Sequence, residues 1–339
     1  MAGLSAGEPE APVRATDAVV VGSGPNGLAA ALTLARAGLT VDVYEGAGTA
    51  GGGCRSEELT LPGFVHDVCS TVHPLLAASP FFQAAALEGL SLRMPDVSFA
   101  HPLDGGRAAI VTRSVGETAA SLGADAAAYR RLLGPLVHDA RTIVPSLLRP
   151  LIAPPPHPLA MARFGIRGLW PLSALARAFR TEPARAALAG LGAHSMRPLS
   201  APGTGAFALL LGMLAHSAGW PVVEGGSARV IDALLAAIAA AGGQLATGRW
   251  ISDLDQLPAR RATLLDVTPR QLTAIAGARL SGRQARALAR FRYGPGICKV
   301  DWALSGAVPW NGERCRETAT LHLGGTLEEI ARGESEVAA

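Results

Sequence analysis

Residues 17–27 read DAVVVGSGPNG, and this stretch decides the fold of the chain. Residues 18–21 form a continuous apolar run, which is typical of a parallel strand buried on both faces of a sheet. Gly22 allows a tight turn after the strand, Gly24 lets the backbone approach a pyrophosphate, and Gly27 permits the next helix to pack closely on the strand. The spacing of these glycines predicts a dinucleotide-binding strand, turn and helix.

The residues that follow complete a βαβ unit. The sequence predicts a helix over residues 25–37, with Pro25 in its first turn and its N–H groups directed at the phosphates. Gly38 is expected to end the helix, residues 39–44 to form the second strand, and Glu45 to place its carboxylate at a ribose 2′-hydroxyl. Because a carboxylate there would repel a 2′-phosphate, the motif favours FAD or NAD over NADP.

Composition bounds the class of protein. The chain has 339 residues, 49% of them hydrophobic, which is enough for two domains with sizeable cores. Its net charge of +3 comes with no basic block or aromatic RNA-binding pattern, so we expect no nucleic-acid partner. The first sixteen residues lack the pattern of a signal peptide, and the longest apolar stretch, residues 206–215, is shorter than the roughly 20 residues that cross a bilayer. We expect a cytoplasmic protein.

Cysteine and histidine spacing predicts no metal site. The four cysteines form no C-x-x-C motif, and in a cytoplasmic chain scattered thiols are most simply reduced and structural. The eight histidines show no ligand spacing either. His66, Asp67 and His73 follow a glycine-rich loop and are candidates for the active site, although a structural role is the simpler interpretation for them, as it is for His194 and His216.

A second glycine-rich loop lies directly beyond Glu45, at residues 46–56, where it serves either as a further cofactor contact or as an ordinary flexible loop. Residues 59–67 predict a hairpin that turns at Pro62 and Gly63. From about residue 74 the pattern changes to apolar helices separated by proline. The sequence there predicts strands near 97–100 and 108–112 joined by a turn at 104–106, a helix over 125–148, and a stiff connection over 150–158.

Residues 161–180 combine three aromatic residues with four arginines. Such a stretch fits a membrane interface, or equally a surface helix that covers a pocket. Pro171 interrupts the run, so no single long amphipathic helix is expected. Peripheral membrane contact is therefore one hypothesis for this segment.

The nucleotide-binding pattern returns after residue 219. A glycine pair precedes a predicted helix over 228–241, and predicted strands follow at 244–251 and 264–267. The sequence therefore predicts a discontinuous nucleotide domain of residues 17–75 and 219–277, and a substrate domain of residues 76–218 and 278–339.

Together these motifs resemble the phytoene desaturase-like carotenoid and retinoid oxidoreductases of the FAD-dependent amine oxidase superfamily. The resemblance is carried by residues 22–27, Glu45, Gly51-Gly52, residues 63–67, and residues 224–227 with the helix and Gly242-Gly243 after them. It implies an α/β fold with a discontinuous, glutathione reductase-type FAD-binding Rossmann domain and an inserted α+β substrate domain. It also implies hydride transfer from a lipophilic substrate to FAD.

The resemblance assigns cofactor contacts residue by residue. The pyrophosphate is expected at the first glycine loop, the adenosine ribose at Glu45, and the flavin side of the diphosphate at the second loop. The predicted FAD-binding residues are Gly22, Ser23, Gly24, Pro25, Asn26, Gly27, Glu45, Gly51, Gly52 and Arg55. No catalytic residue is assigned, because flavin chemistry needs none of the usual nucleophilic arrangements.

The sequence departs from the family pattern in two places. Gly53 stands where the family often has arginine, so Arg55, two positions later, is the flavin contact, unless it simply pairs with Glu57 or Glu58. A Pro-Gly-Gly segment with a final helix facing the flavin ring is missing, which leads us to expect a C-terminally truncated member with weakened FAD binding. Residues 291–296 and 300–305 resemble the substrate-domain sheet of the family.

Three rival functions share parts of this pattern. A disulfide oxidoreductase is disfavoured because Cys69 is far in sequence from Cys54 for the usual redox loop. A flavin amine oxidase has the same nucleotide motifs and differs in its substrate pocket. A non-enzymatic lipid- or prenyl-binding protein on the same fold, as in the guanine nucleotide dissociation inhibitors, does not need the full flavin motif set.

Overall fold

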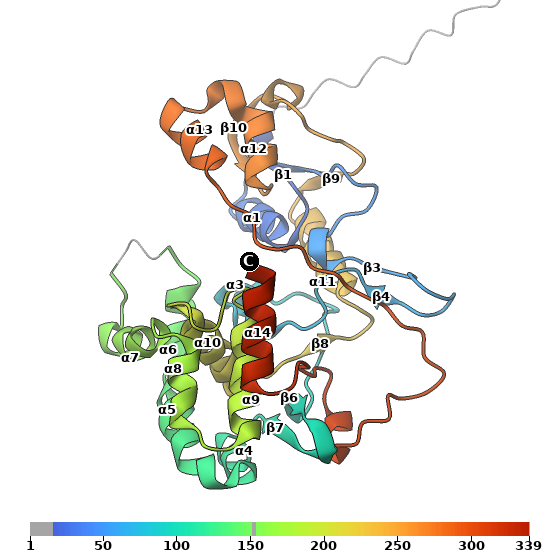
Figure 1. Cartoon of the computed structure of the whole chain (residues 1–339). Helices are drawn as coiled ribbons and strands as arrows, with labels where there is room; N and C mark the ends of the chain where they lie inside the picture. The colour runs from blue at the N-terminus through green and yellow to red at the C-terminus, as the bar shows by residue number, and fades with distance from the viewer. Residues whose placement is uncertain (1–15, 151–153, 339) are drawn as a thin grey trace, which may run out of the picture.

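The computed structural model describes residues 16–150 and 154–338, and Figure 1 shows two units joined along the chain. The upper unit is built on a four-stranded parallel sheet in the order β10-β1-β2-β9. Its strands are β1 (Thr16–Val21), β2 (Val41–Tyr44), β9 (Gln244–Ala246) and β10 (Arg260–Leu265). Two of these strands come from the N-terminal part of the chain and two from beyond residue 240, so the sheet is discontinuous in sequence.

Alternate residues of β1 face opposite sides of this sheet, because side chains alternate along a strand. Ala18 and Val20 belong to a core with helices α1 (Pro25–Arg36) and α11 (Ala228–Ala240). Val19 and Val21 belong to a separate core with α12 (Pro269–Ala276) on the other face. The continuous apolar run in the sequence thus reflects a central strand covered on both faces, which confirms the predicted Rossmann-type α/β architecture.

The lower unit packs helices on a two-stranded antiparallel sheet of β6 (Val97–Pro102) and β7 (Ala108–Thr112). Helices α5, α9 and α10 supply the largest share of its buried core. The helices of this unit are α4 (Val115–Ser121), α5 (Ala126–His138), α6 (Ala140–Leu147), α7 (Pro158–Gly168), α8 (Leu172–Leu175), α9 (Glu182–Ala193), α10 (Thr204–Ser217) and α14 (Leu327–Ala338).

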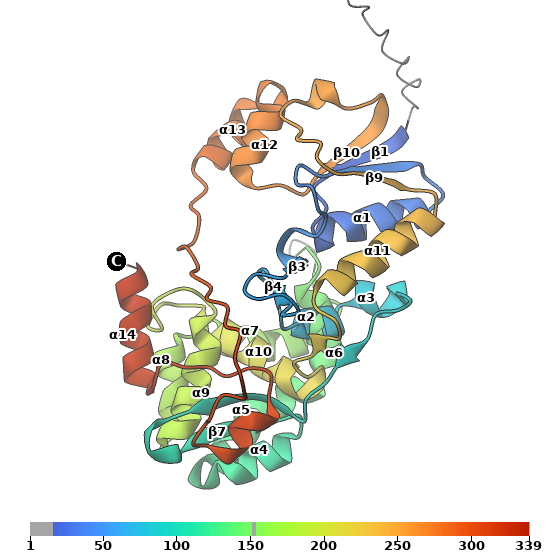
Figure 2. The same ribbon diagram turned by 90° about the vertical axis from the view of Figure 1, so that its right-hand side faces the viewer.

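Short elements connect the two units, as Figure 2 shows from the side. They are β3 (Ser56–Glu57), β4 (His66–Asp67), α2 (Pro74–Ala78), α3 (Pro80–Ala85), β5 (Leu92–Arg93) and β8 (Val222–Val223). β3 pairs with β4, and β5 pairs with β8. Leu76, Phe81 and Phe82 pack against the core of the upper unit. The predicted division between the domains at residue 76 stays a prediction.

Several predicted elements differ in extent from the observed ones. β9 ends at Ala246 rather than at residue 251, because the chain there turns to run beside residues 45–47. β10 starts four residues before the predicted strand and ends before residue 266. The predicted helix over 125–148 divides at Asp139 into α5 and α6. The interruption at Pro171 is confirmed, since it separates α7 from α8.

The prediction of strands at residues 291–296 and 300–305 is wrong. The segment after α13 (Gly282–Ala289) has no regular structure until residue 313, and most of its side chains are exposed. The edge of β6 is instead approached by Leu321, which makes a single parallel bridge to Ala100. In Figure 2 the segment of residues 290–312 runs as an irregular connection from the upper to the lower unit.

The predicted absence of a signal peptide concerns the first sixteen residues, of which only Thr16 lies in the described part of the chain. Residues 151–153 of the predicted connection over 150–158 also lie outside it. Among the helices of residues 16–150 and 154–338, none has both the length and the apolar character that crossing a bilayer requires.

Candidate functional site

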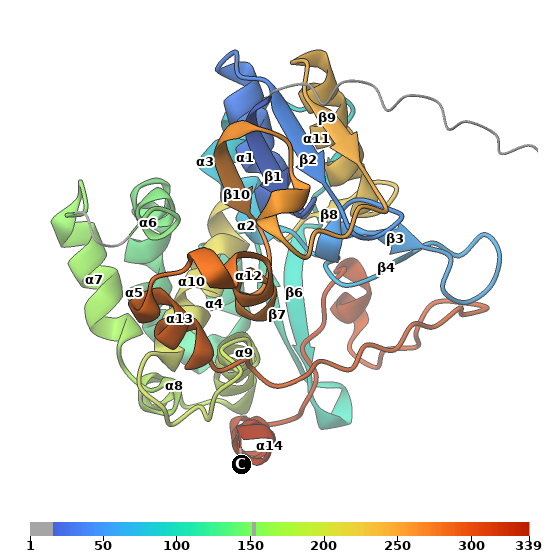
Figure 3. The ribbon, with the colours of Figure 1, turned by 90° about the horizontal axis from the view of Figure 1, so that it is seen from above.

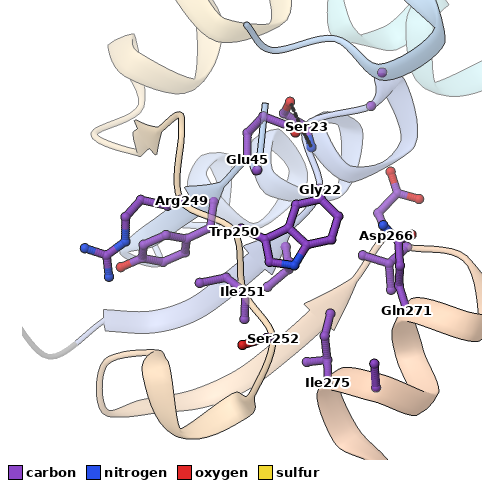
Figure 4. Close-up of a pocket in the computed structure, with 17 residues that line it drawn as sticks. Gly22, Ser23, Glu45, Arg249, Trp250, Ile251, Ser252, Asp266, Gln271 and Ile275 are labelled. Carbon is purple, nitrogen blue, oxygen red and sulfur yellow. Dashed lines mark hydrogen bonds between the residues drawn. The ribbon is translucent and has the colours of Figure 1, made fainter. Parts of the chain in front are cut away.

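A pocket of about 240 Å³ opens at the carboxyl ends of the four parallel strands. Figure 3, seen from above, shows how the loops after these strands converge beside α1 and α12. Open α/β sheets bind ligands at this edge. The polar lining is supplied by Ser23, Glu45, Arg249, Ser252, Asp266 and Gln271, as Figure 4 shows.

Glu45 is held as an ionised hydrogen-bond acceptor. Its Oε2 accepts from the Ser23 amide at 3.1 Å and from Ser23 Oγ at 2.5 Å, and its Oε1 accepts from the Ala47 amide at 2.8 Å. Burial acts to raise the pKa of this carboxyl, but the hydrogen bonds from Ala47 and Ser23 outweigh it, so the pKa is lowered. Glu45 therefore carries a negative charge at neutral pH beside the pocket.

Ser23 connects the two glycine-rich loops to this carboxylate. The Gly51 amide donates to Ser23 Oγ at 3.2 Å, while Ser23 Oγ donates to Glu45. A Cβ on Gly52, whose φ is +54°, would lie 3.2 Å from the Gly24 Cα. The two loops therefore touch, and only glycine at these positions lets both backbones border the same space.

The start of α1 offers backbone donors to an anion. Gly24 is the N-cap of the helix and provides no side-chain cap. The amides of Gly24, Asn26 and Gly52 make no hydrogen bond to the described residues, whereas the Gly27 amide donates to Asp266 Oδ2 at 2.8 Å. Unpaired amides at a helix N-terminus are suited to binding a phosphate.

The structure places most of the predicted cofactor residues around this pocket. Those that line it are Gly22, Ser23, Gly24, Glu45 and Gly52. Pro25, Asn26 and Gly27 form the first turn of α1, and Gly51 joins them through Ser23.

Arg55 is not part of the pocket lining. Its Nε donates to the Gly52 carbonyl at 3.1 Å, and its guanidinium lies 3.5 Å from the Glu57 carboxylate. Of the two roles considered for Arg55, the structure shows the pairing with Glu57.

Sequence reasoning missed the far wall of the pocket. Arg249, Trp250 and Ile251 follow β9, Asp266 follows β10, and Gln271 and Ile275 lie on α12. The position of Asp266 directly after a strand was a usable signal, because carboxyl ends of parallel strands meet at one edge. Residues 249–251 gave none, since they belong to no predicted turn or motif and were assigned to the strand.

A hydrogen-bond network ties the second half of the nucleotide domain to the first. Asp67 Oδ1 accepts from Ser56 Oγ and from the Ser227 amide, both at 2.7 Å. A bond of 2.8 Å joins Ser227 Oγ and His73 Nε2, and burial lowers the pKa of His73. Asp67 and His73 thus have structural partners, and neither lines the pocket.

The cysteines give no support to a redox site. All four are free, Cys54 is buried and Cys69 is exposed. Burial raises the pKa of Cys54, which disfavours the reactive thiolate. Within the part of the chain that the structure describes, no group of three or more His, Cys, Asp or Glu side chains is arranged to hold a metal ion.

Comparison with known proteins supports the fold. Residues 20–84 match the model of an NAD(P)-binding Rossmann-like domain. No curated protein matches the chain in sequence. An oxidoreductase from Methanosarcina mazei is similar in structure, with 18% identity over 82% of this chain and 66% of that one, and a TM-score of 0.56.

Two further solved structures are similar over an equal share of the chain. PF1083 from Pyrococcus furiosus has 16% identity, covers 82% of this chain and 66% of its own, and gives a TM-score of 0.52. Wild-type putrescine oxidase bound to putrescine has 20% identity, covers 82% and 64%, and gives a TM-score of 0.51. This chain thus spans less than two thirds of the length of these proteins.

Fold and site together define the class. The chain has a mixed α/β fold with a Rossmann-type dinucleotide-binding domain, and the solved structures of similar fold include an oxidoreductase and a putrescine oxidase.

Proposed function

We propose that this chain binds FAD and forms the core of a flavin-dependent oxidoreductase. The observation that carries the proposal is the convergence of the two glycine loops on the N-terminus of α1, beside an ionised Glu45. The loops and the helix end suit a diphosphate, and the carboxylate suits a ribose diol. We favour FAD over NAD because the second glycine loop, with Gly51 and Gly52, borders the first and is assigned to the flavin side of the diphosphate.

The residues present fit the cofactor. A Cβ on Gly22 or Gly27 would lie 2.3 Å from a backbone oxygen of the protein, so both positions require glycine. The glycines keep the loop compact, and its free amides face the proposed diphosphate. Gly24, Asn26 and Gly52 would hold the diphosphate through their amides, and Glu45 would accept from the ribose. When bound, the flavin would supply hydride acceptance, while the chain orients the substrate and excludes water.

We propose that the substrate is lipophilic, of the isoprenoid or carotenoid class, and that one of its C–H bonds gives up the hydride, as in the phytoene desaturase-like enzymes. The sequence motifs support this choice, and so does the strongly apolar character of helix α10. Amine oxidation is the alternative on the same fold. Oxygen consumption with amines separates the two reactions, whereas a protein that takes up no flavin at all would point to a non-enzymatic lipid binder.

Titration with FAD tests the proposal directly. We expect flavin absorbance to co-elute with the purified protein in buffer containing FAD. Glu45→Ala should weaken FAD binding about 10- to 150-fold, since a hydrogen bond to a charged group is worth about 1.5–3 kcal/mol. Glu57→Ala is the matched control, because Glu57 is exposed and pairs with Arg55 outside the pocket. Equal FAD affinity of the two variants would contradict the assigned role of Glu45.

We also propose that α7 contacts a membrane surface. Leu159, Ile166, Leu169 and Trp170 are large apolar side chains exposed on or just after this helix. Arg163, between them, lies 2.6 Å from Asp139. Sedimentation with vesicles containing anionic lipid tests this contact, and retention of all the protein in the supernatant would overturn it.

A further inference from the structure

Trp250 is an exposed aromatic side chain in the wall of the pocket that follows β9. Its exposure is 66%, whereas the next residue, Ile251, is only 5% exposed and belongs to the core between the sheet and α12. Figure 4 shows the indole projecting into the space that Gly22, Glu45 and Asp266 frame. A large apolar ring is thus exposed to water at this position.

The backbone on either side holds this residue in place. The Arg249 amide donates to the Glu45 carbonyl, and the Gly248 amide donates to the Ala47 carbonyl, both at 2.8 Å. The Arg249 guanidinium also lies over the Tyr44 ring, 5.8 Å from its centroid. Residues 248–251 are therefore fixed alongside the end of β2, directly beside the proposed ribose acceptor.

Gly46 makes room for the indole. A Cβ on Gly46 would lie 3.1 Å from Trp250 Cζ3 and 2.4 Å from Trp250 Cε3, and the shorter distance is one that real Cβ atoms essentially never show, so the ring would have to shift. The glycine after Glu45 consequently lets the ring lie against the backbone. Val21, Ala274 and Ile275 supply further apolar lining of the same pocket.

We propose that Trp250 is the stacking platform for the adenine base of the dinucleotide, seated against Gly46 and next to the ribose acceptor Glu45. This inference rests on the proposed function and adds a binding residue to it. A base needs a flat apolar partner and a short link to its ribose, and Trp250 and Glu45 provide both within one stretch of hydrogen-bonded backbone. Ligands that carry adenine should therefore depend on Trp250, and ligands that lack it should not.

Substitution predicts a graded effect. Trp250→Ala should weaken binding of FAD and of ADP about tenfold, because stacking of a base on an aromatic side chain is worth roughly 5- to 100-fold. Trp250→Phe keeps a smaller platform and should lose about threefold. Gly46→Ala displaces the ring without removing it and should resemble Trp250→Ala. Trp170→Ala, an exposed tryptophan on the other unit, and Gly48→Ala, with no atom within 4 Å of the new Cβ, are matched controls.

The test combines titration with intrinsic fluorescence. Dissociation constants for FAD and ADP are measured on each variant, with thermal denaturation to verify folding, and ADP quenching of tryptophan emission is compared between the unaltered protein and Trp250→Phe. Loss of that quenching in Trp250→Phe, together with weaker FAD and ADP binding in Trp250→Ala and Gly46→Ala, supports the platform. Equal FAD affinities in the unaltered protein and Trp250→Ala overturn it while leaving FAD binding intact. If the unaltered protein binds neither FAD nor ADP, the proposed function fails and the platform with it.

Discussion

Asp266 joins three parts of the nucleotide site at a single residue. Its amide donates to the Val21 carbonyl at 2.8 Å, its carboxylate accepts from the Gly27 amide at 2.8 Å, and its carbonyl oxygen stands where a Cβ on Gly22 would lie. The strand, the turn and the first turn of α1 therefore all contact this one residue. Contacts within the protein therefore already require glycine at positions 22 and 27, where a Cβ would lie 2.3 Å from a backbone oxygen.

Gly22→Ala should disrupt this arrangement. The φ of Gly22 is +104°, and the new Cβ would approach the Asp266 carbonyl oxygen to 2.3 Å. We expect a loss of about 2–3 kcal/mol in the free energy of unfolding, since both backbone strain and a backbone clash are introduced. Denaturant titration measures this loss. Gly48→Ala, where the side chain meets open space, should change stability little, and similar values for the two variants would argue against the clash.

At the scale of elements, remote aspartates cap three helices that provide no side-chain cap of their own. Asp266 accepts from the first turn of α1, Asp67 from the Ser227 amide that precedes α11, and Asp125 from the Thr181 amide that precedes α9. Each aspartate lies far along the chain from its helix. Helix capping in this protein therefore also binds distant segments to each other, in addition to satisfying the unpaired amides.

Asp125→Ala tests this capping in the lower unit. Asp125 is almost completely buried and accepts from the Arg180 amide at 2.9 Å, the Thr181 amide at 2.7 Å and Thr181 Oγ1 at 2.6 Å. Removing the carboxylate leaves these donors without a partner, so we expect a destabilisation of about 3 kcal/mol by denaturant titration. Asp104→Ala, at an exposed turn, is the control and should have a small effect. A loss below about 1 kcal/mol for Asp125→Ala would show that water replaces the cap.

Buried histidines should make stability depend on pH. Burial lowers the pKa of His216 from 6.5 to about 4, and burial with the neighbouring His194 and His101 lowers that of His322 to about 3. Below about pH 6.5 these histidines bind protons in the unfolded chain but stay neutral in the folded chain. The free energy of unfolding is therefore highest above about pH 6.5 and falls as the pH decreases toward about 4. Thermal denaturation from pH 8 to pH 4 should show the decline. His322→Asn should flatten it and His157→Asn, at an exposed histidine, should not; parallel curves for both would contradict the assignment.

At the scale of the whole molecule, the two units have separate cores. The large core of the lower unit shares no residue with the two cores that flank the parallel sheet. We expect scanning calorimetry to resolve two transitions, with ADP raising only the one that belongs to the nucleotide unit, because a ligand stabilises the state that binds it. A single transition that moves as a whole with ADP would show instead that the units unfold together.

The sequence predicted the first βαβ unit, the second glycine loop and the return of the nucleotide domain, because each has a local pattern of apolar residues and glycine. The wall made by Trp250, Asp266 and Ile275 could not be found in this way. Its residues come together only when β9 and β10 join β1 and β2, which is a tertiary event. The strands predicted between residues 291 and 305 failed for the same reason, since an apolar stretch becomes a strand only where a neighbouring edge accepts it.

The split sheet also has a consequence for synthesis of the chain. Gly27 and its partner Asp266 are 239 residues apart, so at about 5–20 residues per second a ribosome needs on the order of 10 to 50 seconds to deliver the second after the first. During that time β1 has an open edge on the side that β10 later covers, and Val19 and Val21 lack their α12 partner. The glycine loop after β1 is thus synthesised well before the strand and the helix that complete its site, and until then the uncovered edge of β1 is open to pairing with other strands.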